Sequence, residues 1–166
     1  MVTEGVQIYD RLQREGSVEH MSAEEVLQQN APEYPLQLLD GGVRQGMVST
    51  NPSESADHPL GFQTILRFCQ TPDRWVAAVI TKTPETVVVC LPPLSGGSAP
   101  VGYVLLDSHP RPQLGAENAY GKTHESLEEL CVALQAIFPA TDLGPDIPEM
   151  MAMMYNSFDL YPLVLK

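Results

Sequence analysis

Two strongly apolar runs in the middle of the chain constrain its fold more than any other feature. They are WVAAVI (75–80) and TVVVCL (86–91), both rich in β-branched residues and separated by TKTPE. β-Branched side chains favour extended backbone, and a short polar segment between two such runs is typical of a β-hairpin. Because polar residues barely interrupt the runs, we expect both faces of these strands to be buried under helices.

Segments on either side of the hairpin supply helices and a further strand. GYVLLD (102–107) has the composition of a third strand. Residues 60–70 and 126–138 carry apolar side chains at helical spacing, and a proline follows each of them closely. This order of elements predicts an α+β fold with a central sheet flanked by helices.

The length of 166 residues suits one domain. We expect a single domain over 1–166, with a helix- and turn-rich part over 1–50 and a sheet-and-helix body over 60–166. In the first part, helices are expected over residues 6–12 and after a capping box that begins at Ser22.

Residues 34–39 and 43–49 have the pattern of two short strands. We expect them to pair with each other across a turn at Asp40. Residues 51–59 are polar and bracketed by prolines, which predicts a loop.

The C-terminal segment combines a methionine-rich stretch with a final apolar run. Asp146 is expected to cap a helix that carries the four methionines of residues 150–154. Methionine can form adaptable interaction surfaces, but its usual burial favours core positions. FDLYPLVL (158–165) predicts a strand, and Pro162 indicates that this strand lies at an edge.

Charge and cysteine usage restrict the classes of partner. The chain has 21 acidic and 9 basic residues and a net charge of −12. Such a field repels nucleic acid and anionic membrane surfaces and favours a basic protein surface. No apolar run is long enough for a membrane span. The three separated cysteines are typical of reduced thiols, so we expect a cytoplasmic or nuclear protein.

The strand over 102–107 ends on Asp107-Ser108-His109. Residues two apart in a strand share a face, so Asp107 and His109 are expected to project together. A carboxylate beside an imidazole forms the orienting acid and general base of a nucleophilic triad. The alternative is an ordinary strand-ending turn, which a bare Asp-x-His pattern more often is.

The order of these segments adds weight to the triad interpretation. RWVAAVITKTPETVVV, a variable loop, YVLLDSHPRP and an amphipathic helix together resemble the C-terminal half of the papain-like deubiquitinases in herpesvirus large tegument proteins. The resemblance covers roughly residues 60–138. It implies a papain-like fold with His109 as general base and Asp107 as orienting acid. Ser108, Arg111 and Trp75 are the accompanying candidates for a binding surface, and Arg111 is expected to be exposed.

The nucleophile of that family is a cysteine at the start of an upstream helix, and this chain has no cysteine before residue 60. Cys69, Cys90 and Cys131 stand in apolar contexts and are expected to be packing residues. A nucleophilic thiolate needs a polar, partly exposed position instead.

These observations favour a non-catalytic, deubiquitinase-like interaction module that binds ubiquitin or a ubiquitin-pathway protein. One alternative is an active Cys-His-Asp thiol peptidase whose nucleophile comes from an unexpected position or from outside the chain. Another is a scaffold or dimerisation domain unrelated to ubiquitin, which would use the strand over 158–165. The sequence leaves the oligomeric state open.

Cofactor and metal sites are not expected. Gly115 and Gly121-Lys122-Thr123 resemble a phosphate-binding loop, but five residues separate the glycines where that motif has four. The four histidines are scattered and lack the short Cys/His spacing of a zinc site.

Overall fold

The computed structural model describes residues 35–40, 42–49, 60–95 and 102–166. The compact unit considered below spans Leu36–Lys166. The helices predicted near residues 6–12 and after Ser22, and the predicted loop over 51–59, lie outside the described residues.

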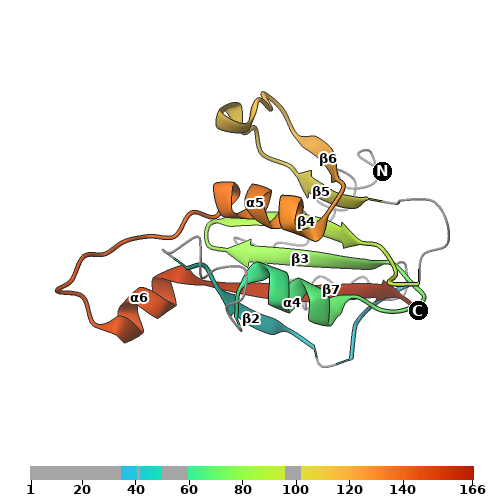
Figure 1. Cartoon of the computed structure of the whole chain (residues 1–166), viewed down its shortest axis with the longest axis horizontal. Helices are drawn as coiled ribbons and strands as arrows, with labels where there is room; N and C mark the ends of the chain where they lie inside the picture. The colour runs from blue at the N-terminus through green and yellow to red at the C-terminus, as the bar shows by residue number, and fades with distance from the viewer. Residues whose placement is uncertain (1–34, 41, 50–59, 96–101) are drawn as a thin grey trace, which may run out of the picture. The chain divides into compact units, whose positions relative to one another are not determined.

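The core of this unit is a seven-stranded antiparallel sheet (Figure 1). The strands follow the order β1-β7-β3-β4-β5-β6, and β2 also pairs with β7. Their bounds are β1 Leu36–Leu38, β2 Arg44–Met47, β3 Val76–Lys82, β4 Glu85–Leu91, β5 Tyr103–Asp107, β6 Tyr120–His124 and β7 Ser157–Leu165. The α+β prediction is confirmed.

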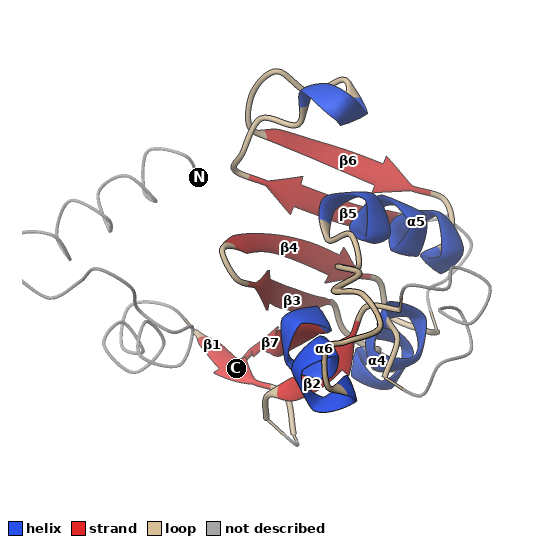
Figure 2. Ribbon diagram, turned by 90° about the vertical axis from the view of Figure 1, so that its left-hand side faces the viewer, coloured by secondary structure: helices blue, strands red, loops and turns tan. Residues whose placement is uncertain are grey.

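Three α-helices accompany the sheet in the part of the chain that the structure describes. They are α4 Phe62–Cys69, α5 Leu127–Ile137 and α6 Glu149–Asn156. Helices α4 and α5 pack side by side on one face of the sheet (Figure 2). The amphipathic pattern predicted both of them. Ser126 caps the N-terminus of helix α5, because its hydroxyl accepts a hydrogen bond from the backbone N–H of Glu129 at 3.1 Å.

The predicted hairpin forms between β3 and β4, in register from Val76 opposite Leu91 to Lys82 opposite Glu85. The expectation that helices bury both faces of these strands is wrong for the described residues. Burial alternates along β3, with Ala78 and Ile80 buried and Ala77 half-buried. The reason is that α4 and α5 both cover the same face. We call this the helix-covered face and its opposite the open face.

The predicted pairing of the first two strands with each other is also wrong. Strand β1 pairs with Leu163–Leu165 of β7, and β2 pairs with Ser157–Leu160 of the same strand. Both run antiparallel to β7, so the chain around Asp40 does not reverse direction. The two strands form one interrupted edge because nine-residue β7 is long enough to pair with both.

Strand β7 lies inside the sheet, between β3 and the β1–β2 edge, so its predicted edge position is wrong. Pro162 is tolerated because of where it falls. Its carbonyl accepts from the backbone N–H of Leu39 at 2.8 Å, so its nitrogen also faces the β1–β2 side. That side is the gap between the two short strands, where no ladder hydrogen bond needs an N–H.

Helix α6 differs from its prediction in two respects. Pro148 precedes its first turn and no side chain caps it, so Asp146 is not the cap. All four of its methionines are exposed, at 45% to 74% of their maximum, and Asn156 is the one buried residue of the helix. The predicted burial of the methionines is wrong because α6 projects beyond the sheet instead of packing on it (Figure 1).

Candidate functional site

The candidate site is built around Asp107, the last residue of β5. Asp107 follows buried Leu105 on the helix-covered face, and its carboxylate is fully buried. One carboxylate oxygen, Oδ1, accepts the backbone N–H of His109 at 2.8 Å. This side-chain-to-backbone bond turns the chain out of the strand immediately after Asp107.

The imidazole of His109 stands beside the same oxygen. Its Nδ1 lies 3.2 Å from Asp107 Oδ1, and the hydroxyl of Ser108 lies 3.5 Å from Nδ1. A proton on Nδ1 satisfies the carboxylate and leaves the lone pair on Nε2. The His109 side chain is 53% exposed, so a partner can reach the ring. Because β5 ends at Asp107, it is the turn that brings these two side chains together.

Arg111 contacts the other side of the carboxylate. Its Nε donates to Asp107 Oδ2 at 2.7 Å, and its terminal nitrogen pairs with Glu85 at the start of β4. The expectation that Arg111 is exposed is wrong, because the loop turns its guanidinium inward toward these two carboxylates. The loop itself is closed by paired backbone hydrogen bonds between Arg111 and Ala116.

Arg111 stabilises the charged form of Asp107. Burial alone would raise the pKa of this carboxyl, but hydrogen bonds from Arg111 and from the His109 backbone outweigh burial and lower it. The pKa of Arg111 is raised, since its bonds to Glu85 and Asp107 outweigh its own burial. Asp107 is therefore an ionised carboxylate that can hold the imidazole in one tautomer.

Strand β6 contributes two polar residues that sequence reasoning missed. Tyr120 pairs directly opposite Asp107, and His124 is buried further along the same strand. The Tyr120 hydroxyl and His124 Nε2 are both buried without a hydrogen-bond partner among the described residues. Burial and the Asp107 charge raise the pKa of Tyr120, whereas burial and Lys122 lower the pKa of His124. Both residues line a cavity of about 850 Å³ between β6 and α5.

The His109 ring hydrogen-bonds with Asp107 and Ser108 and with no cysteine, and Cys131 of α5 interacts instead with Glu128 and Arg67. Cys69 faces the core from α4 and interacts with Arg44 of β2, which lies across β7, β3 and β4 from β5. Cys90 pairs opposite Val104, so strand alternation places it on the open face while Asp107 is on the helix-covered face. Burial raises the pKa of all three thiols, that of Cys131 to about 12.

The structure brings together Asp107, Ser108, His109 and Arg111, but it does not bring Trp75 to them. Trp75 precedes β3 at the end remote from the residues opposite Asp107, and it lines a separate groove on the open face.

The described residues contain no cluster of three His, Cys, Asp or Glu side chains arranged to hold a metal ion. None of the helices found there is both long and apolar enough to cross a bilayer.

The seven-stranded sheet and its helices form an α+β fold that resembles a viral deubiquitinase. Among solved structures, the chain is similar to the ubiquitin-specific protease encoded by the murine cytomegalovirus tegument protein M48, crystallised in complex with a ubiquitin-based suicide substrate. The TM-score is 0.53 at 12% sequence identity, over 97% of this chain and 61% of that chain. The chain thus spans about three fifths of the M48 structure's length, and at this identity the likeness concerns the fold.

No protein-family model matches the sequence. No curated protein matches it at a significant level either. The structural likeness to M48 alone confirms the predicted resemblance to a herpesvirus tegument deubiquitinase, and it does so for the fold.

Proposed function

We propose that this protein is a non-catalytic, deubiquitinase-like module that binds ubiquitin or a ubiquitin-pathway protein. One observation carries the proposal. A buried carboxylate holds a half-exposed imidazole at the end of β5, while every thiol of the chain is placed elsewhere with a raised pKa.

The chemistry of thiol peptidases explains why this combination argues against catalysis. The attacking group is a thiolate, which a neighbouring imidazolium or helix N-terminus stabilises and apolar burial destabilises. With a pKa of about 12, the Cys131 thiol is protonated at neutral pH. His109 has a carboxylate to orient it but no thiol to deprotonate.

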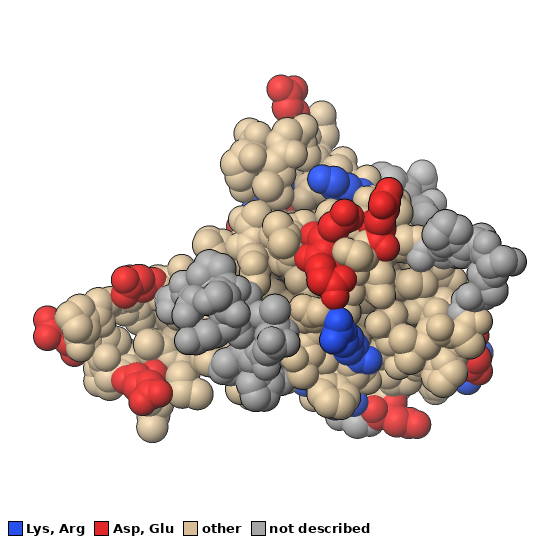
Figure 3. Space-filling model, in the orientation of Figure 1, with Lys and Arg blue, Asp and Glu red and all other residues tan. Residues whose placement is uncertain are grey.

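The binding part of the proposal rests on the fold likeness and on surface charge. The M48 protease was solved with a ubiquitin-based ligand, and we place a ubiquitin-binding surface on the equivalent fold here. Carboxylates gather over the start of α5 on the helix-covered face, where Glu128 and Glu129 occupy its first turn (Figure 3). Such a surface suits a basic patch on a protein partner. The reduced thiols accord with a cytoplasmic or nuclear location, which we also propose.

Two measurements with ubiquitin test the proposal. Ubiquitin bearing a C-terminal electrophile should form no covalent adduct with the protein. Isotope-labelled ubiquitin should nevertheless show chemical-shift changes on titration with the protein. Ser108→Arg places a bulky side chain beside the imidazole, so it should lower the affinity obtained from this titration at least tenfold. Glu149→Gln on distant α6 is the control and should leave binding unchanged. Rapid adduct formation that one Cys→Ala variant abolishes would overturn the non-catalytic proposal.

An active thiol peptidase is the second candidate, and the position of His109 favours it. The ring has its Nδ1 on Asp107 and its remaining nitrogen available, as a general base requires. A nucleophile from another chain would complete the triad. This candidate predicts cleavage of ubiquitin chains that disappears in His109→Ala. Absence of ubiquitin shifts in the titration would instead favour a scaffold function.

A further inference from the structure

The second surface of interest is the segment Thr141–Asn156, which we call the methionine arm. Met150 and Met154 are 74% and 70% exposed, and Ile147 and Tyr155 are exposed beside them. Exposed apolar side chains gathered on one projecting helix are unusual in a solitary protein and are typical of an interaction site. Methionine suits such a site because its flexible, polarisable side chain adapts to a partner.

The arm is tied at its base by Asn156. The side-chain amide of Asn156 donates to the carbonyl of Thr141 at 3.0 Å and accepts the Thr141 N–H at 2.7 Å. Its amide also donates to the carbonyl of Ala152 at 3.1 Å. The two ends of the arm are thereby joined, so α6 is presented from a fixed base.

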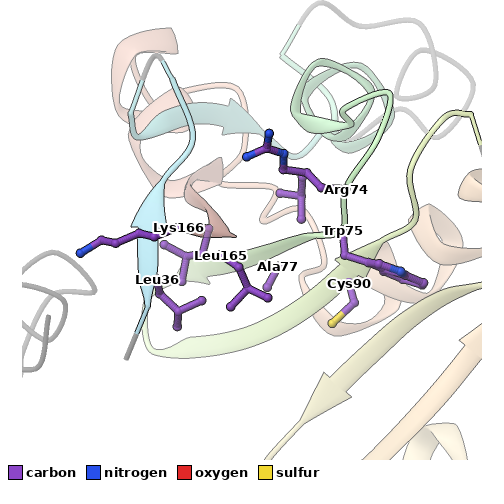
Figure 4. A pocket seen from close by; sticks show the side chains of 9 residues that line it. Leu36, Arg74, Trp75, Ala77, Cys90, Leu165 and Lys166 are labelled. Carbon is purple, nitrogen blue, oxygen red and sulfur yellow. The ribbon is translucent and has the colours of Figure 1, made fainter. Parts of the chain in front are cut away.

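An apolar groove lies at the opposite end of β7, on the open face. We call it the C-terminal groove; its walls are Trp75 and Cys90 on one side and Leu36 and Leu165 on the other, with Ala77 between them (Figure 4). Its volume is about 730 Å³. Trp75 and Leu165 are exposed there, at 43% and 65%.

The charges of the two surfaces are complementary. Asp142, Asp146 and Glu149 lie in the arm, which contains no lysine or arginine (Figure 3). The charged side chains that line the groove are the cations Arg74 and Lys166. Arg74 also contacts Asp73 at 3.5 Å, but both side chains are more than half exposed. Such a surface pair is weak and leaves the guanidinium accessible to another carboxylate.

The arm cannot reach the groove of its own chain. Helix α6 joins the first residue of β7, and the groove is formed at the last residues of that strand (Figure 1). Six residues of extended strand separate Ser157 from Leu163, the first residue of β7 that lines the groove, by roughly 20 Å. The matching groove is therefore the one on another molecule.

We propose that the methionine arm of one copy docks into the C-terminal groove of a second copy, so that the protein self-associates head to tail. Such an interface joins two different surfaces and can repeat from one copy to the next. The proposal is independent of ubiquitin binding.

The test separates the two surfaces with paired variants. Met150→Glu/Met154→Glu disables the arm and keeps the groove, whereas Leu165→Glu disables the groove and keeps the arm. All three positions are exposed, so the fold should tolerate the changes. In analytical ultracentrifugation, the wild type should increase in mass with concentration, and each variant alone should remain at the chain mass of 18.2 kDa. An equimolar mixture should form a species of twice that mass and nothing larger, because each copy retains one working surface.

Phe68→Glu on α4 is the matched control, since Phe68 is 71% exposed but belongs to neither surface. It should associate as the wild type does. A wild type that remains at 18.2 kDa up to near-millimolar concentration would overturn the proposal. So would a mixture of the two variants that stays monomeric while the wild type associates.

Discussion

Asp107 divides its two oxygens between groups of different kinds. One faces the half-exposed imidazole of His109 and the other the buried guanidinium of Arg111. The first contact suits binding or catalysis, and the second holds the loop to β4 through Glu85. Strand alternation predicted that Asp107 and His109 project together, but β5 ends at Asp107 and the following turn brings the two side chains together instead. Strand alternation could not indicate Arg111, because that contact depends on how a loop between two prolines folds back.

We expect Arg111→Ala to destabilise the protein by about 3–5 kcal/mol, because it leaves a buried carboxylate without its charged partner. The free energy of unfolding in urea at neutral pH measures this loss. Arg67→Ala is the matched control. It breaks an ion pair with Glu128 at 3.0 Å in which both side chains are about 60% exposed, so it should cost less than about 1 kcal/mol. Equal losses in the two variants would contradict a special role for the Arg111 contacts.

His124 should make stability depend on pH. Its pKa in the folded protein is below the ordinary value of 6.5, chiefly because of burial. As the pH falls, the unfolded chain therefore binds a proton at His124 before the folded protein does. The contribution of neutral His124 to stability is fully present above pH 6.5 and is lost as the pH falls toward and through the folded pKa. The free energy of unfolding of the wild type, measured in urea, should fall between pH 7.5 and pH 5.5, which is about one unit on either side of the ordinary pKa. His124→Gln should reduce that decline, and His109→Gln should retain the part due to His124.

At the scale of elements, the sequence predicted those whose own pattern was sufficient. The β3–β4 hairpin has two β-branched apolar runs, and helices α4 and α5 have clear helical periodicity; each formed where it was expected. Strand β6, YGKTH, was missed because it has no apolar run and contains a glycine. The partner of β1 and β2 was wrong because it lies more than 100 residues away, and local turn chemistry carries no information about β7.

The pairing of β2 with β7 requires a glycine at position 46. Gly46 lies opposite Phe158 of β7, and a Cβ at Gly46 would lie 2.0 Å from the Phe158 ring. That ring stacks on Phe62 at 4.3 Å, so it has no room to withdraw. We expect Gly46→Ala to cost about 3 kcal/mol through overpacking.

Gly121→Ala is the matched control, because its Cβ would meet nothing closer than the end of the Leu106 side chain at 3.1 Å and the Leu105 carbonyl oxygen at 3.9 Å. Its effect on the free energy of unfolding should stay within about 1 kcal/mol. Urea denaturation of both variants checks the contrast, and an equally tolerant Gly46 would show that the β2–β7 pairing is not rigid.

For the whole unit, one face of the sheet is covered by α4 and α5, and helix α6 projects with its methionines exposed. Composition gave the overall sign of the charge. It could not say that the methionines are outside, because burial depends on which surfaces remain after the sheet and helices have packed. The same limit applies to the thiols. Their apolar contexts suggested packing, but only the assembled fold places them away from His109.

This arrangement predicts how the three thiols react in the native protein. Cys69 and Cys131 are buried in the core with raised pKa values, so alkylation by iodoacetamide should require global unfolding and accelerate with urea. Cys90 is half-buried on the open face, so it should react first and without urea. Mass spectrometry of the native protein at about pH 7.5 should therefore show one slow modification, at Cys90. A thiol activated as a nucleophile would instead react rapidly, and its reaction would slow in His109→Ala. The alkylation rate of each cysteine depends on how much of it is an accessible thiolate. One rapidly alkylated cysteine whose rate depends on His109 would therefore favour the peptidase over the binding module.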